Sequence, residues 1–277
     1  MDVFYLITNQ MKDTDNRVTN EIKAYIEQHG KVCYISEKDE QGYILPGSVP
    51  KDIQCALVIG GDGTLIRAAR QLSGTDIPLL GINMGTLGYL AEVELNEVHH
   101  ALDRLFEDDM EIENRMMLNG KVCGVSEHTA LNDIVVTREG SLRIVHFNVY
   151  VNNVLLNSYH ADGIIVSTPT GSTGYNLSAG GPIIEPTASM FVITPICSHA
   201  LNASSIVLSG EDTIEVEIGE GRYRGTEHAC VTFDGTEMLS VMTGDRIAIQ
   251  KAQNTTRLLK LNKESFMKIM RKKMKGN

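Results

Sequence analysis

The hydrophobic pattern divides the chain near residue 112 into two parts with different periods. In the first part, short apolar runs typical of buried strands alternate with segments whose apolar residues recur every three or four positions. The strand-like runs are residues 3–8, 31–35, 55–60 and 79–83. The helical stripes cover Val18 to Ile26, with Gly30 expected to end that helix, and Leu95 to Phe106. This alternation predicts a mainly parallel sheet with helices on both faces.

After residue 112 the helical period fades and short strands separated by turns follow. Ile144 to Val151 alternates weakly, Asn152-Asn153 has the composition of a hairpin turn, and Thr213 to Ile218 alternates clearly. The last strand is expected at Arg246 to Gln250, before a C-terminal helix. We therefore predict that the second part of the chain is all-β.

The peptide Leu57 to Leu65 is the strongest local signal of chemistry. An apolar strand stops at two glycines, and Asp62 and a third glycine lead into a helix. Glycines let a ligand approach the main chain, and the free N–H groups that open a helix attract anions. Asp62 is compatible with a bound phosphate if a divalent cation lies between them, or if it accepts a proton from the hydroxyl being phosphorylated. The alternative is a tight turn in which Asp62 only caps the helix.

Two more glycine-rich segments follow strand-like runs. The first covers residues 79–90, and the second, longer one covers residues 162–182. The longer segment combines hydroxyls, glycines and the aromatic ring of Tyr175, which suits hydrogen bonding to sugars and phosphates and stacking on a base. The alternative is a solvated loop rich in serine, threonine and glycine.

Composition and charge narrow the class of protein. The net charge of −10 argues against a general nucleic-acid binder. Five scattered cysteines predict reduced thiols and a cytoplasmic protein, and no run is long or apolar enough to span a membrane. The N-terminal run is short and is expected to be a strand, not a signal peptide. The basic run Lys268 to Lys275 favours a solvated helix packing on the fold over an interaction tail.

Five segments together resemble NAD kinases and follow the order of that family. They are GGDGT at 60–64, GINMGTLGYL at 81–90, LNDIVV at 131–136, DGIIVSTPTGSTGYNLSAGGP at 162–182 and ITPICSHAL at 193–201. A GGDG peptide alone also occurs in lipid kinases and phosphofructokinases, whereas the segment at 162–182 is specific to NAD kinases. The resemblance implies transfer of the terminal phosphoryl group of ATP to the 2′-hydroxyl of the adenosine ribose of NAD.

The resemblance also implies roles for individual residues. Asp62 matches the family's catalytic base, and Gly61, Gly63 and Thr64 would supply close backbone approach and hydrogen-bond donors. Two further residues, Asn132 and Asp133, match a pair that contacts the ribose hydroxyls; read without the family, they form an Asx turn that opens a strand.

The remaining matches concern the dinucleotide. The adenine and ribose loop corresponds to Thr173, Gly174, Tyr175, Asn176, Leu177 and Ser178, and Asp162 matches an aspartate at the nicotinamide end. Basic positions correspond to His160, where the family often has arginine, and to Arg143, for which a solvent-facing strand position is the alternative. Thr236 stands where the family frequently has glutamine or asparagine. Tyr175 could instead be a core residue, and His199 and His99-His100 are expected to be structural and surface residues.

The expected organisation is an α/β domain at 1–112, joined by a C-terminal helix at 252–277, and an all-β dinucleotide-binding domain at 113–251. By resemblance, the cofactor is a divalent cation, most simply Mg²⁺, with no ligands assigned, and the chain forms a homo-oligomer, a dimer or tetramer. Whether polyphosphate replaces ATP is left open. The alternative functions are a diacylglycerol-type lipid kinase and a dinucleotide sensor that has lost turnover.

Overall fold

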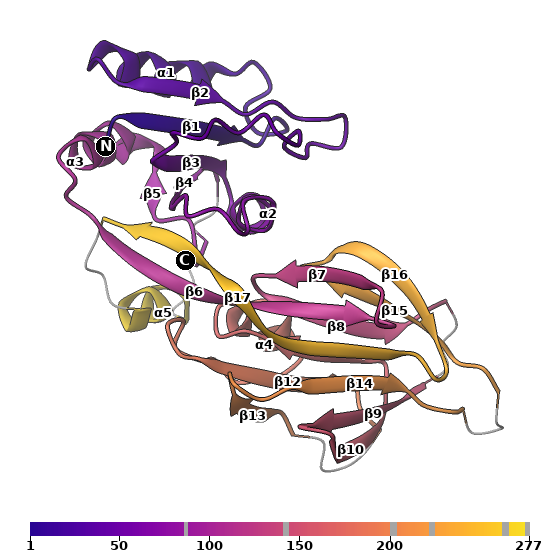
Figure 1. Ribbon diagram of the computed structural model, residues 1–277. Helices are drawn as coiled ribbons and strands as arrows, with labels where there is room; N and C mark the ends of the chain where they lie inside the picture. The colour runs from indigo at the N-terminus through magenta and orange to yellow at the C-terminus, as the bar shows by residue number, and fades with distance from the viewer. Residues whose placement is uncertain (86–87, 141–143, 200–203, 222–224, 262–265, 275–277) are drawn as a thin grey trace. The chain divides into compact units, whose positions relative to one another are not determined.

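The structure is a computed structural model that describes residues 1–85, 88–140, 144–199, 204–221, 225–261 and 266–274 (Figure 1). The chain divides into two compact units, one made of Met1–Asn114 with Thr256–Asn277 and the other of Arg115–Thr255. The two-domain organisation predicted from the hydrophobic pattern is confirmed. The exact boundaries at 112 and 251 stay a prediction.

The first unit contains a parallel sheet with the strand order β2-β1-β3-β4 (Figure 1). Its strands are β1 (Val3–Thr8), β2 (Val32–Ile35), β3 (Cys55–Gly60) and β4 (Leu79–Asn83), and the short β5 (Val93–Glu94) also pairs with β4. All four predicted strands are confirmed. Strands β1, β3 and β4 are almost entirely buried, and buried strands of this kind appear in the sequence as continuous apolar runs, whereas β2 is largely exposed.

Helices cover both faces of this sheet. On one face, Ile22 of α1 (Arg17–Gln28) and Leu102 of α3 (Val98–Phe106) share a core with Leu80 of β4. On the other face, Leu65 of α2 (Asp62–Gln71) lies against Gly81. A 3-10 turn, η1 (Leu95–Glu97), precedes α3, and α5 (Phe266–Met274) belongs to the same unit. The parallel strands therefore all end at one edge, beside the start of α2.

The second unit is all-β, as predicted, and its strands form a β-sandwich. One antiparallel sheet has the order β10-β9-β14-β17 and the other β13-β12-β11-β8-β15-β16, and β6 pairs with β7 and β17. Side chains from both sheets, including Phe147 and Phe191, fill a common core. The strands are β6 (Glu111–Val122), β7 (Ser126–Ala130), β8 (Asp133–Arg138), β9 (Val145–Val151), β10 (Val154–Ala161), β11 (Gly163–Ser167), β12 (Met190–Ile196), β13 (Ile206–Ser209), β14 (Ile214–Ile218), β15 (His228–Phe233), β16 (Thr236–Met242) and β17 (Arg246–Lys260).

The prediction that the last strand ends at Gln250 and gives way to a helix from residue 252 is wrong. Strand β17 continues to Lys260, and in the first unit Leu258 pairs in parallel with Leu79 of β4. Beyond that pair, Glu92 accepts a hydrogen bond from the Leu261 N–H (2.8 Å) and forms an ion pair with Lys260 (2.9 Å). A strand neighbour this distant in sequence leaves no local signal.

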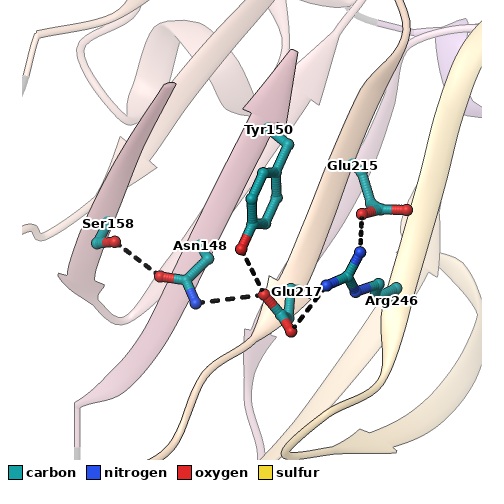
Figure 2. Close-up of polar contacts among 6 residues, drawn as sticks. All are labelled: Asn148, Tyr150, Ser158, Glu215, Glu217 and Arg246. Atoms are coloured by element: carbon teal, nitrogen blue, oxygen red, sulfur yellow. Dashed lines mark hydrogen bonds and ion pairs between the residues drawn. The ribbon is translucent and has the colours of Figure 1, made fainter. Parts of the chain in front are cut away.

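The outer face of the four-stranded sheet carries a polar network across all of its strands. Its members are Ser158 of β10, Asn148 and Tyr150 of β9, Glu215 and Glu217 of β14, and Arg246 of β17 (Figure 2). Glu217 accepts hydrogen bonds from the Tyr150 hydroxyl (2.8 Å) and the Asn148 amide (3.3 Å), and Arg246 bridges Glu215 and Glu217. Burial alone would raise the pKa of Glu217, but these hydrogen bonds and the charge of Arg246 lower it.

Candidate active site

In the first unit, the carboxylate of Asp62 is fixed by the glycine-rich segment that follows β4. Its Oδ2 accepts a hydrogen bond from the Tyr89 N–H (2.7 Å), and its Oδ1 accepts from the N–H groups of Leu90 (3.2 Å) and Ala91 (3.1 Å). Helix α2 begins at Asp62, its N-cap residue is Gly61, and the cap has no side-chain hydrogen bond. The alternative that Asp62 only caps the helix is therefore wrong.

The hydrogen bonds of Asp62 explain why residue 88 is glycine, and they leave one acceptor position on the carboxylate free. A Cβ atom at Gly88 would lie 1.8 Å from the Asp62 Oδ1, so only glycine permits the contact. A carboxylate offers about four lone-pair positions. With one N–H on Oδ2 and two on Oδ1, Oδ2 retains a position for a metal ion or a substrate hydroxyl.

Thr64 and Gly63, which follow Asp62 at the start of α2, differ in burial. Thr64 is buried, and its hydroxyl accepts a hydrogen bond from the Asn9 amide (3.2 Å). Gly63 is exposed, with nothing within 4 Å of a Cβ placed on it. Thr64 thus packs the corner against the turn after β1, while the main chain at Gly63 is open to a ligand.

In the second unit, three segments meet at one end of β8. Asp234, in the turn between β15 and β16, accepts hydrogen bonds from the N–H groups of Leu131 (2.8 Å), Asn132 (2.7 Å) and Asp133 (3.1 Å). Asp133 is 5 % exposed, and burial, followed by the negative charge of Asp234, raises the pKa of Asp133 to about 7. The predicted Asn-Asp pair therefore lies on a backbone that a second carboxylate fixes.

The loop after β11 packs on the same pair. The main-chain oxygen of Asn132 accepts the N–H of Thr168 (2.8 Å), and a Cβ at Gly171 would lie 2.2 Å from that oxygen. Gly174 also lies near, since its Cβ would be 3.5 Å from the Asn132 amide nitrogen. The Asn132 Oδ1 is buried without a hydrogen-bond partner in the described part of the chain. An orphaned acceptor of this kind is suited to a ligand hydroxyl.

The predicted adenine and ribose loop combines buried and exposed residues. Asn176 is fully buried; its amide donates to the carbonyl oxygens of Ser172 (3.1 Å) and Pro182 (2.9 Å), and its Oδ1 accepts from the Thr194 hydroxyl (2.6 Å). Tyr175 is 46 % exposed. The exposed residues that flank Asn176 are Tyr175, Leu177 and Ser178, while Thr173 and Gly174 are half-buried. Asn176 thus holds the loop in shape, and its exposed neighbours can face a ligand.

Asp162 and His160 lie at the opposite end of β11 from the Asn132 pair. Four residue steps along the strand separate the two ends, roughly 13 Å. The Arg138 guanidinium donates a hydrogen bond to Asp162 (2.9 Å). The imidazole of His160 is exposed and stacks on His146, with the ring centroids 4.5 Å apart. The structure therefore groups the predicted residues of this unit at two ends of one strand.

Arg143 lies outside the described residues. Thr236 opens β16, and its hydroxyl donates to the main-chain oxygen of Phe233 (3.0 Å), within the turn that contains Asp234.

The sequence pattern did not indicate three groups that contact the predicted residues: Asp234, Arg138 and the N–H groups of residues 89–91. The Asp234-Gly235 pair is a turn signature, and both residues have positive φ (51° and 68°). That signature predicts the turn. It does not predict that the Asp234 carboxylate binds the backbone at Asn132, about 100 residues away.

In the part of the chain that the structure describes, a divalent cation needs ligands from the substrates and from water. Among the described residues, no group of three or more histidines, cysteines, aspartates or glutamates is placed to hold a metal. Mg²⁺ is commonly held by one or two carboxylates together with substrate phosphates and water. The open position on Asp62 meets that requirement.

The first unit holds a fixed carboxylate at a glycine corner, and the second unit presents hydroxyls and amides. Together these features are typical of a phosphotransferase that acts on nucleotide-type substrates. Models of the ATP-NAD kinase N-terminal and C-terminal domains match residues 8–110 and 131–261. The chain belongs to the NAD kinase family.

Individual relatives agree with this assignment. The NAD kinase of Agathobacter rectalis is 49 % identical over 100 % of this chain and 99 % of its own, and that of Lachnoclostridium phytofermentans is 43 % identical over 99 % of both chains. An NAD kinase from Archaeoglobus fulgidus, solved in complex with ATP, has a TM-score of 0.80 at 25 % identity and covers 98 % of both chains. Yeast NADH kinase shares the fold, with a TM-score of 0.85 at 20 % identity over 100 % of this chain and 88 % of its own. Neither the lipid-kinase nor the sensor alternative is supported.

All five cysteines are free thiols, as predicted. None of the described helices has the length and apolar character that a membrane crossing requires.

Proposed function

We propose that this NAD kinase transfers the terminal phosphoryl group of ATP to the 2′-hydroxyl of the adenosine ribose of NAD, with Asp62 accepting the hydroxyl proton. The observation that carries this proposal is the fixed Asp62 carboxylate with one open acceptor position. Phosphoryl transfer depends mainly on positioning and charge neutralisation, so a rigid carboxylate beside exposed glycine backbone is suited to it.

We assign the substrate roles that the family resemblance implies to the residues at the two ends of β11. Asn132 and Asp133 bind ribose hydroxyls, the exposed residues near Tyr175 contact adenine and ribose, and Asp162 binds the nicotinamide end. The buried, unpartnered Asn132 Oδ1 supports the ribose assignment. Mg²⁺, held by the phosphates of ATP and by water, would neutralise charge on the transferred group.

A coupled assay for NADP formation from ATP and NAD tests the proposed function directly. We expect ATP-dependent NADP formation that requires a divalent cation. Phosphorylation of diacylglycerol instead of NAD, or NAD binding without NADP formation, would contradict the proposal.

Tyr175→Ala tests the binding role of the loop. Because this ring is largely exposed, its removal is expected to weaken NAD binding by about 1–3 kcal/mol, with little change in ATP affinity or melting temperature. Titration calorimetry with NAD and thermal melts measure both effects. A lower melting temperature with unchanged NAD affinity would show that Tyr175 is a packing residue.

His160→Arg tests whether the imidazole replaces a fixed cation. Protonated His160 would attract the anionic dinucleotide, so the KM for NAD is expected to rise as the pH increases from about 6 to about 7, and the arginine variant should flatten that rise. Identical pH profiles for the two proteins would exclude His160 from the site.

Assembly and location are also proposals. We propose a cytoplasmic homo-oligomer, a dimer or tetramer, as the family resemblance implies. Exposed Val154 and Leu155 on the edge strand β10 support a surface that a second copy covers.

A further inference from the structure

Lys12 places an ammonium group beside both glycine corners of the first unit. Its Nζ donates a hydrogen bond to the main-chain oxygen of Met84 (2.5 Å), just after β4. Cβ atoms built on Gly61 and Gly85 would lie 3.4 Å and 3.2 Å from this Nζ. The charge therefore lies next to the main chain at the start of α2 and at the turn that follows β4.

The turn that carries Lys12 is tied to the same corner. The Lys12 N–H donates to the main-chain oxygen of Asn9 (3.0 Å), and the Asn9 N–H donates to that of Ile59 in β3 (2.8 Å). The Asn9 side chain reaches Thr64 in α2. These contacts place the backbone of Lys12 in a defined position relative to Asp62.

The charges in this region favour an anion. Lys38, after β2, donates to the main-chain oxygen of Thr8, and burial, followed by the charge of Arg67, lowers the pKa of Lys38 to about 8. Within the described residues, none of Lys12, Lys38 and Arg67 forms an ion pair with a carboxylate. Lys12 lies beside the start of α2, so its ammonium group is suited to a polyanion, and Lys38 and Arg67 add positive charge to the same unit.

We propose that the Lys12 ammonium binds the terminal phosphates of ATP at the α2 corner, an assignment that rests on the proposed function. An ammonium has three N–H donors, and one of them is used on Met84, so two remain for phosphate oxygens. Charge on those oxygens spreads further in the transition state. Lys12 therefore contributes to donor binding and to turnover, whereas it makes no contribution to NAD binding.

Two variants separate the charge of Lys12 from its hydrogen bond. Lys12→Gln keeps a donor for the Met84 carbonyl without the charge, and Lys12→Met removes both. We expect each variant to raise the KM for ATP about tenfold and to lower turnover by about the same factor, with the KM for NAD changed by less than about twofold. Lys12→Arg should restore part of the ATP affinity. Lys23→Met is the matched control, because Lys23 forms an exposed ion pair with Glu27 on α1.

Steady-state kinetics with each substrate varied, together with calorimetric titration of ATP in the absence of NAD, decide the assignment. A wild-type KM for ATP in Lys12→Gln, or equal rises in the KM values for ATP and NAD, would overturn it. A lower melting temperature alone in Lys12→Met would show that the lysine only ties the turn to Met84. If the wild-type protein forms no NADP from ATP and NAD, the proposed function fails; if it does and the Lys12 variants match it, only this assignment fails.

Discussion

Asp62→Asn is expected to lower the turnover of NAD phosphorylation by about two orders of magnitude or more, because the variant cannot accept the hydroxyl proton. The structure adds a second effect. An asparagine oxygen can still accept the N–H groups of Leu90 and Ala91, but its NH₂ would face the N–H of Tyr89. That unsatisfied contact should lower the free energy of unfolding by about 1–3 kcal/mol. Coupled-assay turnover at saturating substrates and thermal melts measure the two effects separately.

Asp212→Asn is the control for the stability effect. The Asp212 carboxylate also accepts a backbone N–H, from Ser209 (3.0 Å), and the Asn152 amide (2.7 Å), but it lies in a turn of the second unit outside the proposed binding residues. The turnover of the Asp212→Asn variant should stay within about twofold of wild type. If Asp62→Asn retained more than about a third of wild-type turnover, Asp62 would not be the base and Asp133 would become the next candidate.

At pH 8, Asp133→Asn is expected to raise the free energy of unfolding by about 2–4 kcal/mol, and this gain should disappear near pH 4. Burial, followed by the charge of Asp234, raises the pKa of Asp133 to about 7, whereas an unfolded aspartate titrates near 3.9. Between these values the folded chain holds a proton that the unfolded chain has lost. The stability of the wild-type protein therefore falls as the pH rises from about 4 to about 7, and neutral asparagine removes that fall.

Urea unfolding of both proteins between about pH 4 and pH 8 measures this difference. If the free energies of unfolding of the wild type and Asp133→Asn changed in parallel with pH, the raised pKa of Asp133 would be contradicted. Glu217→Gln is a control of opposite sign, because the pKa of Glu217 is lowered and its variant should lose stability above about pH 4.5. If Asp133 also binds ribose hydroxyls, its variant should raise the KM for NAD about tenfold while stabilising the fold. Stabilisation with unchanged NAD affinity would limit Asp133 to a structural role.

The strands of the first unit could be predicted because their signal is local. Each is a continuous apolar run, and glycines follow β3 and β4 where the chain turns toward α2 and the segment at 85–91. The second half of β17 could not be predicted in this way. Its partner is β4, and the polar segment from Gln253 to Thr256 gives no strand period of its own.

The same contrast holds for the candidate site. Asp62 and the segment after β4 were each recognisable from glycine spacing, but their hydrogen bonds join residues 27 to 29 positions apart and follow only from the packing of α2 beside β4. The backbone of Asp133 is likewise held by Asp234, which lies 101 residues further along the chain. The residue types at a strand-to-helix turn indicate its chemistry. The groups that orient those residues come from segments distant in the sequence, which a local pattern does not show.

The parallel pairing of Leu258 with Leu79 has a consequence for synthesis on the ribosome. The first unit receives its last strand neighbour and the contacts of Glu92 only when residues 256–261 have emerged. Until then a nascent chain exposes part of the edge of β4, next to the strand that leads into Asp62, and an unpaired edge invites association with other chains. A message that ends early would therefore yield a fragment with an exposed strand edge, which favours aggregation.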